Sequence, residues 1–210
     1  MQKHDIKVSK TARYFQLGER SDQIKEIWFV LHGYGQLASS FLNKFDVLND
    51  GQKLVIAPEG LHRFYWEGFS GKVVASWMTK EDRQADISDY IEYLDAVYRE
   101  VVASVDVRIR LLGFSQGTAT ACRWAVLGKA KFNELILWSG AFPDDVDYVN
   151  NTSLLNTLNI KLLVGDEDQF FAMQQVVDHK EAIEAKGVKV ELITFDGEHK
   201  IYDEPLVSII

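Results

Sequence analysis

The chain has 210 residues, of which 47% are hydrophobic, and a formal net charge of −8 with an isoelectric point near 5.1. This length fits one globular domain over residues 1–210 and excludes a second. The acidic balance disfavours nucleic acid as a partner, because phosphate binding needs a basic surface, and it also opposes stable association with anionic membranes. No apolar run approaches the roughly 18 residues that a membrane span needs.

The chain contains a single cysteine, Cys122. It excludes an intrachain disulfide and fits a reducing compartment. Because the first five residues also lack the apolar core of a secretion signal, we expect a cytoplasmic protein. Cys122 itself lies in helix-compatible sequence, where we expect it to pack as a small buried residue. The sequence has no HExxH, CxxC pair or Walker motif, so we expect no metal and no cofactor.

Strand and helix patterns alternate along the chain. In order, we expect strands near 12–17 and around Trp28, a helix over 38–48, a strand over 53–57, a helix from about Arg83 to Ala103, a strand over 107–112, a helix over 118–127, a strand over 134–138, a strand around Leu162, a helix over 171–186 and a last strand over 188–195. Residues 60–80 are the least regular. This alternation predicts an α/β fold, with a mostly parallel central sheet, helices on both faces and ligands at the carboxyl ends of the strands.

The sequence Gly113-Phe114-Ser115-Gln116-Gly117 lies where a buried strand is expected to pass into a helix. A G-x-S-x-G pattern in that setting predicts a nucleophile elbow, in which a sharp turn lifts the serine hydroxyl clear of the sheet. Glycines flank the serine for a steric reason, since its backbone is strained and neighbouring chain passes close by. Ser115 is therefore the candidate nucleophile.

A serine hydroxyl needs a histidine to take its proton and a carboxylate to orient that histidine. Two histidines, His179 and His199, follow Ser115 in the chain. His179 lies within a helical pattern among polar residues, which indicates a solvated helix face. His199 follows a strand-like segment and the turn Asp196-Gly197, so it is expected in a loop at a strand's carboxyl end. His199 is the better candidate for the base.

The acid is expected between the nucleophile and the base in the chain. The apolar strand that includes Leu162 runs into the sequence Gly165-Asp166-Glu167-Asp168. Asp166 and Asp168 compete for the role on this pattern alone. A second acidic group, Asp144, Asp145 and Asp147, lies in a loop after Pro143 and is the weaker candidate.

Catalysis also needs two donors for the negative charge of the tetrahedral intermediate. One is expected to be the backbone amide of Gln116, the residue after the nucleophile. The other is expected from the glycine-rich turn His32-Gly33-Tyr34-Gly35, which follows an apolar strand and leaves the amide of Tyr34 free to point inward. His32 precedes Ser115 and is better interpreted as a hydrogen-bonded structural residue than as a base.

These features together resemble the carboxylesterase and acyl-protein thioesterase branch of the serine α/β-hydrolases. The matching segments follow the family's order and cover nearly the whole chain. They are LHGYG (31–35), LVIAPEG (54–60), ASWM (75–78), DISDYI (86–91), LLGFSQG (111–117), VGDED (164–168) and GEHK (197–200). The resemblance implies an α/β-hydrolase fold without a separate cap domain, and hydrolysis of small-molecule carboxylic esters or thioesters through an acyl-enzyme.

The resemblance also favours Asp168 over Asp166 as the acid and assigns the first oxyanion amide to Tyr34. The chain departs from the family's pattern at several positions. Gln36 stands where the family usually has aspartate, Thr118 replaces a glycine after the elbow, and the usual Phe-Asp is missing after Trp77. These differences concern the natural substrate rather than the chemistry.

Residues 60–80 contain several large apolar side chains on a glycine-containing frame. Two interpretations remain open for them. The rings either plug the core beneath a long loop or form an apolar wall or lid for an acyl chain, with Trp66, Phe69 and Trp77 as candidate substrate-binding residues.

Two other functions are compatible with parts of the sequence. The segment 33–38 matches G-x-G-x-x-A between a strand and a helix, and Glu59 lies near the spacing of a ribose-binding acid, so a dinucleotide-binding protein is one alternative. It leaves the segments around Ser115, Asp168 and His199 without explanation. The other alternative is a non-catalytic relative that only binds ligand, although such chains usually lose a member of the triad and this one has a full set.

Overall fold

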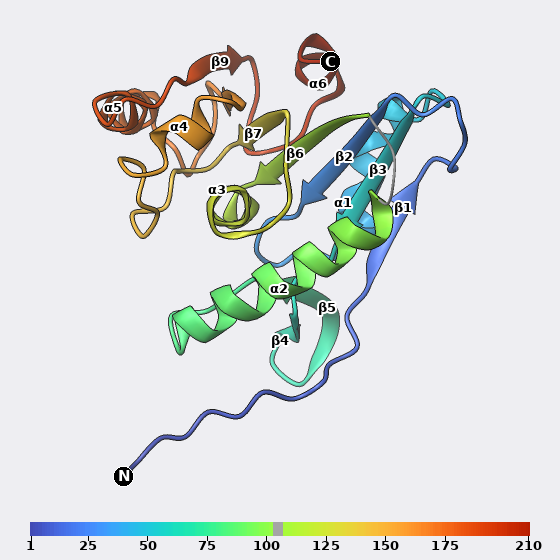
Figure 1. Ribbon diagram of the computed structural model, residues 1–210, viewed down its shortest axis with the longest axis vertical. Coiled ribbons are helices and arrows are strands. Elements are labelled where there is room, and N and C mark those ends of the chain that lie inside the picture. The colour runs from blue at the N-terminus through green and yellow to red at the C-terminus, as the bar shows by residue number, and fades with distance from the viewer. Residues whose placement is uncertain (103–106) are drawn as a thin grey trace.

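The computed structural model of the protein describes residues 1–102 and 107–210. Its centre is a seven-stranded sheet with the strand order β1-β3-β2-β6-β7-β8-β9 (Figure 1). The strands are β1 (Tyr14–Leu17), β2 (Glu26–Leu31), β3 (Lys53–Pro58), β6 (Arg108–Phe114), β7 (Glu134–Trp138), β8 (Asn159–Gly165) and β9 (Glu191–Phe195). The edge strand β1 pairs with β3 in antiparallel fashion, whereas the pairs from β3 to β9 are parallel. The carboxyl ends of these parallel strands therefore meet at one edge, where Ser115 follows β6.

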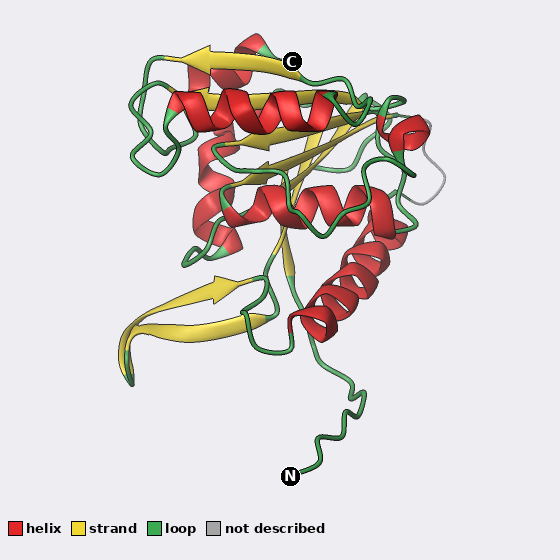
Figure 2. Cartoon of the chain, turned by 90° about the vertical axis from the view of Figure 1, so that its left-hand side faces the viewer, coloured by secondary structure: helices red, strands yellow, loops and turns green. Residues whose placement is uncertain are grey.

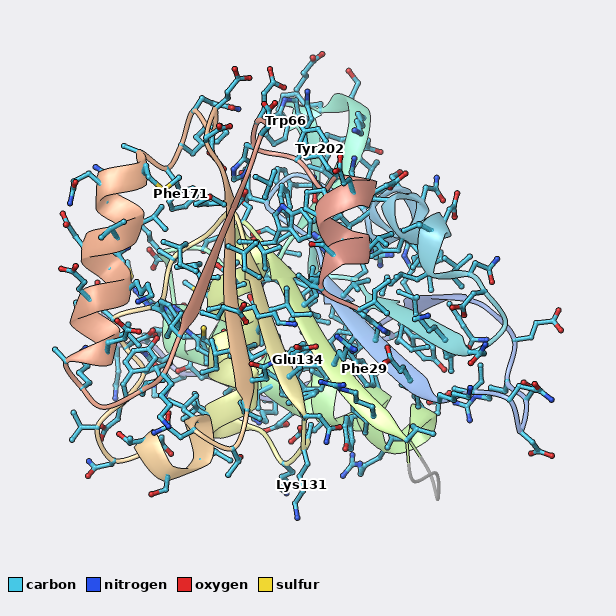
Figure 3. All side chains as sticks on the ribbon, turned by 90° about the horizontal axis from the view of Figure 1, so that it is seen from above. Phe29, Trp66, Lys131, Glu134, Phe171 and Tyr202 are labelled. Atoms are coloured by element: carbon cyan, nitrogen blue, oxygen red, sulfur yellow. The ribbon has the colours of Figure 1, made fainter. Side chains whose placement is uncertain are left out.

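Helices cover both faces of the sheet (Figure 3). The central strands are continuous apolar runs whose successive side chains point to opposite faces, so both faces must be buried. One face packs against α2 (Arg83–Val101), α3 (Gln116–Leu127), α4 (Thr152–Leu155) and α5 (Met173–Glu184). The other face packs against α1 (Ala38–Leu42), a 3₁₀ helix η1 (Asn43–Leu48) and α6 (Asp203–Ser208). This is the predicted α/β-hydrolase architecture. No helix in the described parts of the chain is long and apolar enough to cross a membrane.

The helices differ from the prediction in detail. The helix expected over 38–48 divides into α1 and η1, and the three-residue repeat of η1 directs both Phe45 and Leu48 into the core. The expected end of α2 at Ala103 lies outside the described residues. Cys122 is buried in α3 as predicted, and burial raises the pKa of its thiol to about 12.

The segment expected to be irregular contains a β-hairpin instead, formed by β4 (His62–Glu67) and β5 (Ser70–Ser76). The expectation of an irregular frame over residues 60–80 was therefore wrong. Aromatic and β-branched residues such as Phe64 and Val74 favour strands, and Gly68, with φ of 74°, allows the turn. The hairpin projects away from the central sheet (Figure 2).

A buried ion network lies near the amino ends of the central strands. The guanidinium of Arg110 on β6 pairs with Glu134 on β7 and, at 3.0 Å, with Glu26 on β2. Glu134, labelled in Figure 3, also pairs with Lys161 of β8 at 2.8 Å and is fully buried. Arg110 additionally donates to the carbonyl of Ile209 at 2.8 Å. The network therefore joins four strands and anchors the segment that follows α6.

Candidate active site

Ser115 lies at the turn between β6 and α3 with a backbone conformation of φ 53° and ψ −116°. This positive φ is strained for a residue with a side chain. A Cβ atom on Gly113 would lie 2.3 Å from the carbonyl oxygen of Gly117, and one on Gly117 would lie 2.2 Å from the carbonyl oxygen of Leu31. The flanking glycines are therefore required by close backbone contacts, which is the steric reason that the sequence indicates.

His199 and Asp168 form a hydrogen-bonded pair beyond the ends of β9 and β8. The Nδ1–H of His199 donates to Oδ2 of Asp168 at 2.7 Å, and the amide of Phe170 donates to Oδ1 at 2.9 Å. The carboxylate of Asp168 is buried, so these bonds fix it in place. Asp166 is exposed and instead accepts from the amide of Gly197 at 3.0 Å. The structure thus brings Asp168, and not Asp166, to His199.

The imidazole of His199 is held next to the elbow by aromatic rings. The ring of Phe114, the residue before Ser115, lies 4.9 Å from the imidazole between centroids. Phe170 packs edge-on at 4.7 Å, and Phe171 stacks at 6.0 Å with an interplanar angle of 18°. In the described parts of the chain the Ser115 hydroxyl has no hydrogen-bond partner, as is common in free enzymes, where such bonds tighten when substrate binds.

Two free amides lie beside Ser115. Among the residues that the structure describes, the amides of Tyr34 and Gln116 donate to no protein group. Gln116 begins α3, where the helix dipole contributes partial positive charge. The turn that carries Tyr34 touches the elbow, since a Cβ on Gly33 would lie 3.1 Å from Cβ of Ser115. Both amides can therefore serve an anion bound at this serine.

The turn that carries Tyr34 is fixed from two sides. The amide of Gly33 donates to Oε1 of Gln36 at 2.9 Å. The amide of Gly35 donates to the carbonyl of Ala75 at 3.0 Å, and the amide of Ala75 returns a bond to the carbonyl of Gln36 at 3.1 Å. Gln36, one of the departures from the family's pattern, thus holds the turn through both its side chain and its main chain.

The side chain of Gln116 has a structural contact that sequence analysis missed. Its Oε1 accepts from the amide of Trp77 at 3.2 Å, and its Nε2 donates to the carbonyl of Met78 at 3.1 Å. It also contacts the hydroxyl of Ser76. The residue after the candidate nucleophile therefore joins the elbow to the segment after β5. The sequence predicts a role only for the backbone amide of Gln116, because the partners of its side chain are about 40 residues away in the chain.

Thr118 is the second of the departures from the pattern that the resemblance implies. Its hydroxyl donates to the carbonyl of Ser115 at 2.7 Å and is buried. A Cβ on the neighbouring Gly140 would lie 2.2 Å from this hydroxyl oxygen, so the threonine fills the available space. Thr118 therefore stabilises the backbone of the elbow and does not contact the serine hydroxyl.

His32 is a structural residue, as predicted. Its Nδ1–H donates to the carbonyl of Gly33 at 2.8 Å, and its Nε2 accepts from the amide of Gly60 at 3.0 Å. Complete burial lowers the pKa of His32 to about 4, so the imidazole is neutral near pH 7. Both ring nitrogens are engaged, and neither can act as a base.

The three aromatic residues proposed for substrate binding lie in different environments. The ring of Trp66 packs on the turn that carries Tyr34, 5.8 Å from the tyrosine ring, and is half-exposed. Figure 3 shows Trp66 at the edge of the molecule. Phe69 is fully exposed in the turn at the far end of the hairpin, so the structure does not bring it to Ser115.

Trp77 requires a correction. It was expected among the residues that line an acyl site, but its side chain is 0% exposed. Its indole N–H donates to the carbonyl of His32 at 2.8 Å, and its ring stacks on that imidazole at 5.0 Å. The core-plug interpretation therefore holds for Trp77, because a fully buried ring cannot line a pocket.

The remaining acidic candidates are engaged elsewhere. Asp145 accepts hydrogen bonds from Nε and Nη2 of the buried Arg123 and pairs with Arg83 at 2.7 Å. Asp147 accepts from the amide of Asn150 at 3.0 Å. Neither carboxylate contacts His199. Asp145 thus joins the loop after Pro143 to α2 and α3, and Asp147 bonds within the loop.

Two further candidate residues lie outside this site. His179 is exposed on α5, as expected. Glu59 is buried, and its carboxylate accepts from Arg13 at 2.7 Å and from the amide of Ala38 at 3.3 Å, so it is not free to bind a ribose. Within residues 1–102 and 107–210, no three His, Cys, Asp or Glu side chains are grouped so that they can hold a metal ion.

The fold is that of the α/β-hydrolases. The family model described as Phospholipase/Carboxylesterase matches residues 14–210, and the chain belongs to this family. The protein is accordingly an esterase-type hydrolase, and the dinucleotide-binding alternative is excluded. A search among curated proteins found no match.

Solved structures share the fold of this chain. The Zea mays acyl-protein thioesterase 2 is similar with a TM-score of 0.72 and 15% identity, covering 95% of this chain and 96% of its own. The esterase PE8 has a TM-score of 0.69 and 19% identity over 95% and 96% of the two chains. A phospholipase/carboxylesterase from Dyadobacter fermentans DSM 18053 has a TM-score of 0.66 and 16% identity over 98% and 97%. At these identities the likeness concerns the fold alone.

Proposed function

We propose that the protein is a serine hydrolase that cleaves carboxylic esters or thioesters through an acyl-enzyme intermediate, with Ser115 as nucleophile, His199 as general base and Asp168 as the orienting acid. The observation that carries this proposal is the 2.7 Å hydrogen bond from His199 to the buried Asp168, held by aromatic contacts beside a serine on a strained turn. Nucleophile, base and orienting carboxylate are the three parts that acyl transfer needs.

In the proposed mechanism, Nε2 of His199 takes the hydroxyl proton as Oγ of Ser115 attacks the carbonyl carbon. Asp168 keeps the proton on Nδ1 and stabilises the imidazolium that forms. The carbonyl oxygen becomes an anion that accepts hydrogen bonds from the amides of Tyr34 and Gln116. Collapse of the intermediate breaks the bond to the alcohol or thiol, which takes the proton from Nε2. Water then attacks the acyl-enzyme with the same base, and the acid and free serine are released.

We further propose that Trp66 and the adjacent Tyr34 form an apolar wall for the acyl group. Both rings are half-exposed, and Trp66 packs on the turn whose Tyr34 amide is proposed for the oxyanion, so they lie on the side where the acyl carbonyl must bind. The described chain has no separate cap domain, which limits how much of an acyl chain it can enclose. Short to medium acyl chains are therefore the expected substrates. The buried thiol of Cys122 fits a reducing compartment, and the cytoplasm is the proposed location.

Covalent labelling tests the proposed nucleophile. A fluorophosphonate probe should add to Ser115, and Ser115→Ala should lose both labelling and turnover. The matched control is Ser139→Ala, which removes a fully buried hydroxyl near the end of β7. A label on any other serine would overturn the assignment, and a wild-type protein without labelling or turnover would indicate a relative that only binds ligand. A panel of p-nitrophenyl esters beside acyl thioesters then separates the two substrate classes.

A further inference from the structure

Phe170 is an exposed aromatic residue in direct contact with the candidate base. Its amide donates to Asp168 at 2.9 Å, which fixes the backbone, and its ring packs edge-on against the imidazole of His199 at 4.7 Å. Nevertheless 65% of Phe170 is exposed. Large apolar side chains usually gain from burial, so a ring that is anchored at a catalytic pair and left open is suited to contact a ligand.

The other rings around the imidazole are not open in the same way. Phe114 is buried in the core of one sheet face, and Phe171 is partly buried against the core of the other. Figure 3 shows Phe171 beside α5. They hold His199 from inside the protein. Phe170 is therefore the ring of this group that a bound substrate meets first.

The chemistry of the reaction indicates which part of the substrate, the leaving group or the acyl group, lies beside Phe170. In the first half, the group that leaves must lie next to His199, because it receives the proton from Nε2. The acyl group instead lies toward the turn of Tyr34, where its carbonyl oxygen meets the oxyanion amides. Phe170 touches His199, whereas Trp66 touches the turn of Tyr34. The two exposed rings thus serve opposite ends of the scissile bond.

The charges on the neighbouring loops narrow the class of leaving group. Asp166 and Glu167 precede Phe170 and are exposed, and Glu198 precedes His199 and is also exposed. Lys200 offsets Glu198 by pairing with it. The remaining negative charge disfavours an anionic leaving group.

We propose that Phe170 is a specificity-determining residue that selects flat, apolar, uncharged alcohols or thiols as leaving groups, with aryl or benzyl groups bound against its ring. This inference rests on the proposed function, since it requires Ser115 and His199 to act as nucleophile and base. It is distinct from acyl-chain selection at Trp66.

Two isomeric esters separate these ends of the substrate. Benzyl acetate carries its ring on the leaving group, and methyl phenylacetate carries the same ring on the acyl group. The measurement is the ratio of their kcat/KM values, benzyl acetate over methyl phenylacetate. Phe170→Ala should lower this ratio roughly threefold to tenfold, the range expected for one aromatic contact. Phe170→Tyr should preserve the ratio. Leu127→Ala, which trims an exposed apolar residue at the end of α3, is the matched control and should leave it unchanged.

The outcomes are distinguishable. A lower ratio in Phe170→Ala with the wild-type pH–rate profile supports the proposal. An unchanged ratio overturns it, and so does an equal loss on both esters with a shifted pH–rate profile, which would make Phe170 a support for His199 only. Faster hydrolysis of the 4-carboxybenzyl ester than of benzyl acetate by the wild type would overturn the uncharged class. If Ser115→Ala kept full activity on both esters, the proposed function itself would fail.

Discussion

Two aspartates two residues apart differ in what they contact. Asp168 is buried against His199, whereas Asp166 is exposed and bonded to Gly197. Asp168→Asn should lower kcat by roughly 10⁴ with little change in substrate affinity, because the imidazole loses its tautomer and orientation. Asp166→Asn should cost far less. Steady-state kinetics of the two variants on one ester check this, and the reverse order of effects would exchange their roles.

His32 gives a residue-scale prediction on pH and stability. Its pKa is lowered to about 4 in the folded protein by burial, whereas an unfolded histidine titrates near 6.5. Between these values the unfolded state binds more protons than the folded state, so stability falls as the pH drops from about 6.5 toward 4. At pH 5 the loss from this group should be about 2 kcal/mol relative to pH 7.

Urea unfolding of the wild type and of His32→Gln at pH 7 and pH 5 checks this expectation. Glutamine does not titrate but retains an acceptor for the amide of Gly60. The difference in unfolding free energy between the two proteins should therefore shrink on acidification. Parallel pH dependence of the two proteins would show that His32 is not the titrating group.

The hairpin of β4 and β5 is the element expected to set acyl-chain preference. Trp66→Ala should raise KM for the longer esters, by up to about 2 kcal/mol of lost burial, while acetate esters change little. Phe69→Ala is the matched control on the same hairpin, because that ring lies in the distal turn. The measurement is KM across p-nitrophenyl esters of graded length. If both variants changed stability but not chain-length preference, the hairpin would not contact the acyl group.

Sequence patterns predicted most of the helices and strands but not the hairpin of β4 and β5. Regular alternation and apolar runs marked the sheet strands and longer helices, because their burial follows from local periodicity. In residues 60–80, glycines and scattered aromatic residues obscured the pattern of two strands. One end of the hairpin leads into the core at Trp77, and its other end is exposed at Phe69. Local sequence does not encode that difference in burial.

The candidate site could be predicted to the extent that its parts are local. The elbow glycines and the strand-end positions of Asp168 and His199 follow from short segments. The choice between Asp166 and Asp168 needed the family resemblance, since both aspartates end the same strand. The bonds from the Gln116 side chain to Trp77 and Met78, and the contact of Phe170 with His199, join distant segments, so only the folded chain reveals them.

The ion network of Arg110 links stability across the whole sheet. Arg110→Met should destabilise the protein by about 3 kcal/mol or more, because it leaves Glu134 buried with only part of its compensation. Arg110→Met with Glu134→Leu should recover part of this loss, since the fully buried carboxylate is then absent and the groups that lose a partner, Lys161 and Glu26, are closer to solvent. Denaturant unfolding of the single and double variants gives the comparison, and equal stability of the single variant and the wild type would show that the pair contributes nothing.

The backbone of Ser115 carries a trade-off between stability and activity. Its φ of 53° suits glycine better than serine, so a serine at this half-buried position keeps the turn strained. Ser115→Gly should therefore melt at a higher temperature than the active protein, by the few degrees that about 1 kcal/mol represents, while being inactive. Differential scanning calorimetry checks this, with Ser115→Ala as the variant that keeps the strain. A glycine variant that melts below the alanine variant would mean that the turn stores no strain. If the glycine variant melts at the higher temperature, it is the more stable inactive protein in which to trap an intact ester for crystallography.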